Sequence, residues 1–134
     1  MVVVAIIGIL AAVGYPSYTD YIVRGALTDA NTGLATVRAL MERHYQDNRT
    51  YATSGTFVTP CAVVDASKRT YGNFVIACDA TPTTTEYILS ATGSGPVSGF
   101  TFKITQADVR STTAAKTGYS TCTTKWLMKK GATC

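Results

Sequence analysis

The sequence predicts an α+β domain in which one long N-terminal helix packs on a small antiparallel sheet. Two observations predict this fold. Apolar or small residues recur every three or four positions from Tyr15 past residue 40, which is the spacing of one face of a helix. Further on, Phe100, Phe102 and Ile104 alternate with polar residues, which is the spacing of a half-buried strand. A helix followed by a run of strands is typical of the α+β class.

Length and composition bound the kind of protein. The chain has 134 residues, of which 46% are hydrophobic and 15% are charged. These values fit one domain with a real core and exclude a disordered or collagen-like chain. Threonine is unusually frequent at 23 residues, which suits exposed β-structure outside the cell. The net charge of +4 is uneven, because residues 103–134 hold six Lys or Arg against one Asp.

The chain opens with an apolar run, Met1 to Tyr15, and its first charged residue is Asp20. As a helix the run is about 22 Å long, which is short of the roughly 20 residues that cross a bilayer. Because the helical spacing continues beyond it, we expect one helix of about 45 residues that begins apolar and becomes amphipathic. A soluble monomer would not expose so large an apolar strip. This half of the helix must therefore lie in a membrane or against other copies of the chain.

Two residues of the apolar run and the proline that follows it favour an irregular helix. Gly8 and Gly14 have low helix propensity, and Pro16 removes a backbone donor. We therefore expect a kink or local melting at residues 8–16.

The segment MVVVAIIGILAAVGYPSYTDYIVRGAL resembles the N-terminal helix of type IV pilins. MERHYQDNRTYA resembles the helix end of the type IVa, PilE-like branch, and FTFKITQADVRST with GYSTCTTKW resembles its closing hairpin. In that family a basic leader precedes a methylated phenylalanine and, just inside the mature chain, a glutamate. Alignment of the Tyr-Pro-Ser-Tyr motif places about six mature residues upstream of Met1. They would lengthen the apolar run to the roughly 20 residues that a bilayer requires.

The resemblance implies a structural subunit of a type IV pilus and not an enzyme. Such a subunit sits in the bacterial inner membrane with its domain in the periplasm, and then polymerises through the same helix into a cell-surface filament. The implied roles of that filament are adhesion, twitching motility or DNA uptake. The implied partners are copies of the chain in a helical homo-oligomer, membrane lipid, the pilus assembly machinery, and DNA or a host or abiotic surface. We expect filament-core packing at Val4, Ala5, Gly8, Ile9, Ala11, Ala12, Gly14 and Pro16.

We expect the apolar helix half to cover residues 1–22 and the globular pilin domain to cover residues 23–134. The domain divides into an amphipathic helix half, a connecting loop, and a sheet with a C-terminal loop, at residues 23–47, 48–72 and 73–134. Strands are expected at residues 73–78, 86–92, 100–105 and 109–113, with 119–127 as a last edge segment. A flexible connection is expected at Gly93-Ser94-Gly95-Pro96.

The chain has four cysteines, at positions 61, 78, 122 and 134. Zinc binding is disfavoured because the close paired spacing of structural zinc sites is missing. An even number of cysteines in an exported domain indicates two disulfides. Three pairings are open, and we favour the local ones, Cys61–Cys78 and Cys122–Cys134. The second would enclose a region that resembles the family's C-terminal disulfide-bounded region, which commonly faces outward.

No catalytic, cofactor or metal site is expected. The single histidine, His44, lies on the apolar helix stripe, where packing or capping is the favoured role, and the carboxylates are scattered. Glycine-rich nucleotide-binding motifs do not occur. Asn48-Arg49-Thr50 fits a glycosylation triplet, a pattern short enough to arise by chance.

Two alternatives to a main structural subunit stay open. A minor pilin that acts as a DNA-uptake receptor would use the basic C-terminal region, where lysines lie beside an aromatic residue. Its candidate contacts to DNA or a surface are Lys125, Trp126, Lys129 and Lys130, which otherwise form a solvated basic rim. A pseudopilin of a type II secretion system would share the helix, and would tend to lack the C-terminal disulfide loop.

Overall fold

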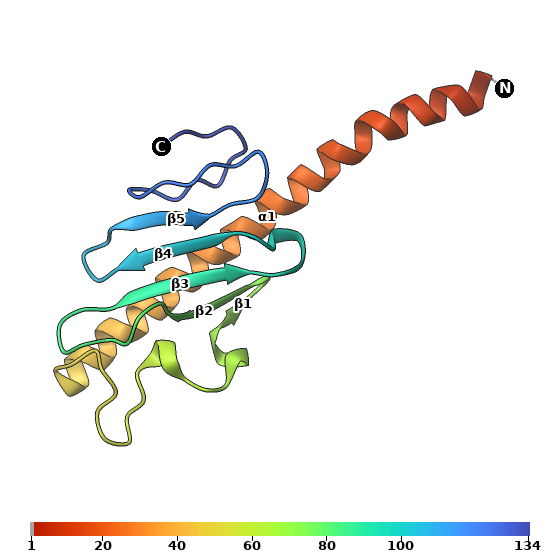
Figure 1. Cartoon of the computed structure of the whole chain (residues 1–134). Coiled ribbons are helices and arrows are strands. Elements are labelled where there is room, and N and C mark those ends of the chain that lie inside the picture. The colour runs from red at the N-terminus through yellow and green to blue at the C-terminus, as the bar shows by residue number, and fades with distance from the viewer. Residues whose placement is uncertain (1) are drawn as a thin grey trace.

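The computed structural model of the chain describes residues 2–134, so the expectations for Met1 lie outside the described residues. One helix, α1 (Val2–Asn48), crosses one face of a five-stranded sheet with its second half and projects from the domain with its first half (Figure 1). All strand pairs are antiparallel. In spatial and chain order the strands are β1 (Thr70–Tyr71), β2 (Phe74–Cys78), β3 (Ile88–Gly93), β4 (Thr101–Thr105) and β5 (Arg110–Ala114). The predicted α+β fold is confirmed.

The second half of α1 forms the core with the sheet because its apolar side chains share one face. The fully buried residues of this face are spaced three or four apart, the period of the helix; they are Leu27, Ala30, Leu34, Val37 and Met41. The helix ends where Arg49 adopts a positive φ of 57° and its N–H donates to the Tyr45 carbonyl at 2.7 Å. A left-handed residue at this position is a common helix C-cap.

The expectation of local melting at residues 8–16 is wrong for the single chain, since α1 remains helical through Pro16. Pro16 costs one backbone hydrogen bond, but the side chains around it are exposed and nothing among the described residues crowds the turn. The Thr19 hydroxyl donates to the Pro16 carbonyl at 2.9 Å. Two glycines and one proline are therefore not enough to interrupt this helix in the single chain.

The sheet turns alternate side chains toward α1. The register pairs Ile76 with Ala91 and Ala91 with Phe102, and all three residues are fully buried. Close approach of the helix depends on Gly33, because a Cβ there would lie 2.9 Å from the Tyr71 ring and 3.0 Å from the Ile76 side chain. The alternation predicted at Phe100, Phe102 and Ile104 is confirmed.

Three connections differ from expectation. The loop at residues 48–72 contains two 3-10 turns, Pro60–Ala62 and Ala66–Arg69, and also β1, which is too short to show a period and forms because β2 pairs with it. The connection at Gly93–Pro96 continues into a third 3-10 turn, Gly95–Val97, that places Val97 fully in the core, so a flexible linker was the wrong prediction. Residues 119–127 form no strand, and their backbone pairs with β5 at the single bridge Thr112–Cys122. Beyond this bridge the Thr112 hydroxyl, and not the β5 backbone, forms the hydrogen bonds to the Lys125 carbonyl and the Leu127 N–H.

Candidate assembly helix and basic C-terminal surface

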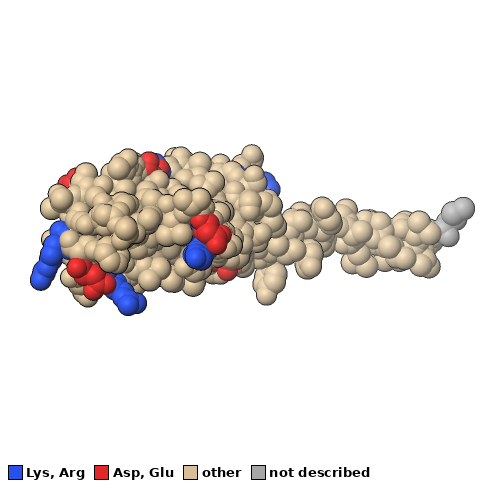
Figure 2. Space-filling model, turned by 90° about the horizontal axis from the view of Figure 1, so that it is seen from below, with Lys and Arg blue, Asp and Glu red and all other residues tan. Residues whose placement is uncertain are grey.

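The projecting half of α1 is an exposed apolar surface. Val2, Val4 and Tyr15 are each exposed by about three quarters, and among the described residues of the helix the first buried one is Val23. Figure 2 shows this half without a charged side chain, whereas charges of both signs are scattered over the visible face of the domain. The helix includes a stretch that is long and apolar enough to cross a membrane, and none of that stretch is buried.

The residues predicted to pack in a filament core all lie on this bare half and are exposed, from Val4 to Pro16. At Gly8 and Gly14 an added Cβ would meet none of the described atoms within 4 Å. The fold of one chain therefore does not require small residues at these positions. Their packing role stays a prediction about contacts between chains.

Three exposed tyrosines lie at the junction of the apolar half and the domain. Tyr15, Tyr18 and Tyr21 are exposed by 74%, 63% and 77%. They flank Asp20, the first charged residue of the chain. A tyrosine has an apolar body and a polar tip, which suits the boundary between an apolar and an aqueous medium.

The C-terminal residues 119–134, here called the closing segment, lie beyond β5 (Figure 1). Cys122 exchanges both backbone hydrogen bonds with Thr112 of β5. The Thr112 hydroxyl then accepts from the Leu127 N–H at 2.9 Å and donates to the Lys125 carbonyl at 3.2 Å. Leu127 is buried, and a disulfide joins Cys122 to Cys134. The closing segment is therefore fixed to the edge of the sheet at both of its ends.

Trp126 lies in a groove between the closing segment and α1. Its Nε1 donates to the Lys103 carbonyl at 2.8 Å, and the Arg110 guanidinium lies 4.7 Å from the centroid of its ring. Arg38 of α1 forms an ion pair with Asp108 at 2.7 Å. The groove has a volume of about 310 Å³ and its walls include Asn31, Ala35, Arg38, Arg110 and Trp126.

The other part of the closing segment reaches the point where α1 leaves the domain. Lys130 Nζ lies 3.5 Å from Asp20 Oδ2, and the Lys130 side chain runs across Gly118. Tyr119 packs edge-on against Phe100 with ring centroids 4.8 Å apart. Burial and the nearby Asp20 carboxylate raise the pKa of the Tyr119 hydroxyl, so this side chain stays neutral.

The structure separates the four residues that the sequence grouped as candidate DNA or surface contacts. Trp126 is half-buried in the groove beside Arg38, whereas Lys130 pairs with Asp20, which lies 18 positions from Arg38 along α1, or about 27 Å along the helix axis. Lys125 and Lys129 are exposed. Sequence reasoning missed Arg110, which stacks on Trp126, because no pattern indicates a contact between the first residue of β5 and a residue of the closing segment 16 positions later.

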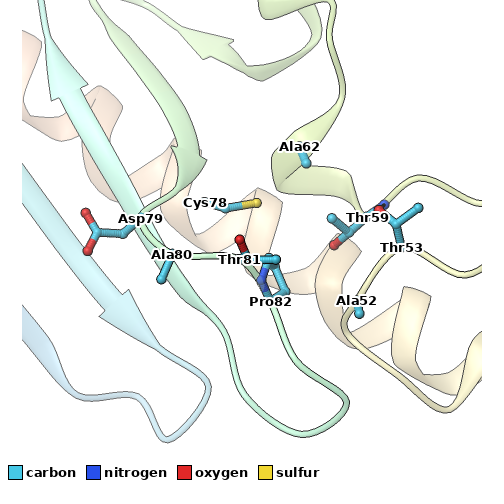
Figure 3. Close-up of a pocket in the computed structure, with 9 residues that line it drawn as sticks. All are labelled: Ala52, Thr53, Thr59, Ala62, Cys78, Asp79, Ala80, Thr81 and Pro82. Carbon is cyan, nitrogen blue, oxygen red and sulfur yellow. Dashed lines mark hydrogen bonds between the residues drawn. The ribbon is translucent and has the colours of Figure 1, made fainter.

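The second disulfide, Cys61–Cys78, fixes the loop after α1 to the end of β2. These two disulfides are the local pairings that the sequence favours. An open cavity of about 580 Å³ lies beside Cys78, between that loop and the β2–β3 connection (Figure 3). Among its nine lining residues Asp79 is the charged one, and its carboxylate already pairs with Lys103 at 2.8 Å. The cavity therefore presents threonine and alanine side chains and little that would orient a ligand.

Two polar side chains on the last turns of α1, His44 and Glu42, form hydrogen bonds within the domain. His44 Nε2 donates to the Ala52 carbonyl at 3.0 Å, which is the packing role expected for this histidine. Glu42 accepts hydrogen bonds from the hydroxyls of Tyr51 and Tyr87, both at 2.9 Å. Burial, followed by the hydrogen bond to Glu42, raises the pKa of Tyr51 to about 12 and raises the pKa of Tyr87 further. The amide of Asn48 donates to the His44 carbonyl at 3.1 Å.

Comparisons with known proteins agree with this architecture. Residues 16–124 match the model of the family described as type IV minor pilin ComP, DNA uptake sequence receptor. A fimbrial protein of Moraxella nonliquefaciens is 40% identical over 52 residues, which are 39% of this chain and 34% of that protein. The match thus spans about a third of the relative's length.

A solved structure shares the fold at low sequence identity. The non-core minor pilin PilV of Neisseria meningitidis superposes with a TM-score of 0.54 over 72% of this chain and 92% of that chain, at 14% identity. This likeness shows that the chain has the fold of that pilin. The chain belongs to the type IV pilins, in the family of the minor pilin ComP, and the resemblance seen in the sequence is confirmed.

Proposed function

We propose that this pilin is anchored in the bacterial inner membrane by the exposed half of α1, residues 1–22, and then joins a surface filament through the same half. The observation that supports the proposal is the bare apolar helix, which is uncharged before Asp20 and exposed on all sides among its described residues. Water is a poor medium for such a surface. The remaining domain, residues 23–134, would stay outside the lipid.

Transfer from lipid to filament needs more than hydrophobicity, because lipid tails are as apolar as leucine side chains. Association of helices in that setting depends on close packing of small residues. The exposed half of α1 supplies such residues at Ala5, Gly8, Ala11 and Ala12, where no part of the same chain competes for the space. We infer that these positions lie in the helix contacts of the filament core.

Intact mass of the subunit from sheared surface filaments, measured without reducing agent, tests this proposal. Two disulfides remove four hydrogens from the thiol form, so reduction should add about 4 Da as an internal control. Recovery of the subunit in filaments with this mass supports the anchored and assembled subunit. Recovery in the membrane fraction alone, with none in filaments, would contradict assembly.

We also propose a second role, binding of duplex DNA by the basic C-terminal surface. Two observations favour it: the family description of a DNA uptake sequence receptor, and the exposed Lys125 and Lys129 on the same segment as Trp126, on which Arg110 stacks. Lysines and arginines displace counterions from phosphates, and an aromatic ring gives a surface for stacking.

Charge reversal tests the second role with the full chain in detergent micelles. Lys125→Glu with Lys129→Glu should weaken binding of duplex DNA and lower the slope of log Kd against log salt by about 2. Lys130 is left unchanged, because a glutamate there would oppose Asp20. Lys68→Glu with Arg49→Glu, which makes the same change in net charge away from the closing segment, is the matched control. DNA binding that is equal in the double variant and the control would remove this role.

A further inference from the structure

Cationic side chains gather where two turns of the chain meet the point at which α1 leaves the domain. We define the neck collar as Arg24, Lys116, Lys129 and Lys130, all of which are exposed. Arg24 lies one helical turn beyond Asp20, and the three lysines come from two turns that flank the closing segment. These residues are far apart in the sequence, so the tertiary structure alone brings them together.

Backbone hydrogen bonds hold the two turns of the collar against one another. The Gly131 N–H donates to the Gly118 carbonyl at 3.0 Å, which joins the turn after Lys129 to the turn after Lys116. Within the turns, the Tyr119 N–H donates to the Lys116 carbonyl at 2.9 Å and the Ala132 N–H donates to the Lys129 carbonyl at 3.1 Å. The Lys130 pair with Asp20 then fixes both turns to α1.

The collar has an excess of positive charge. Of its four cations, Lys130 is the one that forms an ion pair among the described residues, with Asp20. Among residues 2–134 no ion pair engages Arg24, Lys116 or Lys129. A surface with three unpaired cations attracts anions, and the Asp20 carboxylate, which an anionic surface would repel, is already paired with Lys130.

The position of the collar along α1 matches the edge of a membrane. From Val2 to Arg24 the helix rises about 33 Å, and the exposed Tyr15, Tyr18 and Tyr21 mark the end of the uncharged stretch. Tyrosines gather at the headgroup level of bilayers, on both sides of a hydrocarbon core about 30 Å thick. Arg24 lies within one turn of Tyr21, at the level where headgroup phosphates begin.

We propose that, before assembly, the neck collar lies on the anionic phospholipid headgroups of the membrane that holds α1, with the three tyrosines in the interfacial layer. The proposal rests on the membrane anchoring proposed above and adds a lipid class and an orientation to it. Lipid is favoured over DNA because the collar faces the same end as the inserted helix, where the bilayer would block a duplex. Assembly would then have to release this contact.

Amine footprinting of the full wild-type chain in vesicles tests the proposal. The chain is reconstituted in phosphatidylcholine vesicles with and without phosphatidylglycerol, acylated with a membrane-impermeant reagent, and each of the six lysines is quantified by mass spectrometry. In anionic vesicles the acylation of Lys116 and Lys129 should fall about fivefold relative to Lys125 and Lys68, and high salt should restore it. Lys68 precedes β1 at the opposite edge of the sheet and Lys125 lies beside the Trp126 groove, so both are internal controls.

A variant sharpens the test without changing a labelled amine. Arg24→Gln should reduce the protection of Lys116 and Lys129, whereas the matched Arg49→Gln at the distal end of α1 should leave it unchanged. Equal acylation in both vesicle types overturns the proposal. Equal protection of all six lysines also overturns it, because this would mean that the anionic surface repels the reagent. Protection in phosphatidylcholine vesicles that grows with protein density overturns it as well, because this would indicate contact between copies of the chain. Resistance to carbonate extraction is measured in parallel: failure to insert in either vesicle overturns the anchoring itself, whereas insertion without protection overturns the collar contact alone.

Discussion

The substitution Gly8→Leu should separate the fold of the single chain from its assembly. In the isolated chain an added side chain at Gly8 has open space, because none of the described atoms lies within 4 Å of its Cβ position. Leucine also has a higher helix propensity than glycine, by about 0.8 kcal/mol in an exposed helix. The variant should therefore fold at least as well as the wild type, with unchanged thermal unfolding of the domain in detergent.

The same leucine should be costly in the filament if Gly8 lies in a close helix contact. Insertion of a side chain into a packed contact costs about 1–3 kcal/mol. At about 1.4 kcal/mol for each factor of ten, association of one subunit falls about 5- to 150-fold. The same loss of association free energy applies to every copy of the variant subunit that enters the filament. Ile9→Leu keeps the side-chain volume at the adjacent position and should leave assembly unchanged.

The assay compares the amount of the subunit in sheared surface filaments with the amount in membranes, for the wild type and both variants in the same bacterial host. The reasoning predicts a strong loss from filaments for Gly8→Leu, with a normal membrane pool. A wild-type amount of the Gly8→Leu subunit in filaments would refute close packing at this position. A loss that is equal in Ile9→Leu would refute the argument from added volume.

Three further predictions concern the domain. Tyr87→Phe removes a buried hydroxyl that donates to the Glu42 carboxylate of α1 and should lower the unfolding free energy by about 2 kcal/mol in urea. Because folding raises the pKa of Tyr87, the stabilisation by its protonated hydroxyl is complete below about pH 10 and is lost as the pH rises further. The unfolding free energy of the wild type should therefore fall more steeply above pH 10 than that of the variant. Replacement of Cys122 and Cys134 by alanine opens a loop with a sequence separation of 12 and should cost about 3 kcal/mol in the chain-entropy view; an unchanged urea midpoint would argue against it. Gly118→Ala combines a φ of +90° with a Cβ 2.8 Å from Lys130 and should lower the unfolding free energy by about 1–2 kcal/mol, whereas Gly131→Ala, with open space around it, should lower it less.

Elements with a strong local period could be read from the sequence. The spacing of Ala30, Leu34 and Met41 predicts the buried face of α1, and the alternation at Phe102 and Ile104 predicts β4. Both predictions depend on the geometry of one element alone, since 3.6 residues per turn or two per strand repeat fix which side chains share a face. Elements without a period, such as β1 and the turn that buries Val97, were missed.

The sequence by itself also determined the surface on which the proposed assembly depends. An uncharged, apolar stretch before Asp20 must find an apolar medium or a partner, whatever the rest of the fold is. The identity of the small residues Gly8 and Gly14 is likewise visible without a structure. Their surroundings in a filament lie between chains, and so neither the sequence nor the single chain fixes them.

The tertiary structure alone decided how the C-terminal charges are arranged. In the sequence Lys125, Lys129 and Lys130 form one basic cluster with Trp126. In the fold, hydrogen bonds from Thr112 and the pair between Lys130 and Asp20 spread the closing segment along α1. Trp126 is directed to one groove and Lys130 to the neck. Contacts across 110 positions of sequence depend on where the sheet places its last strand against the helix, and no local spacing encodes that placement.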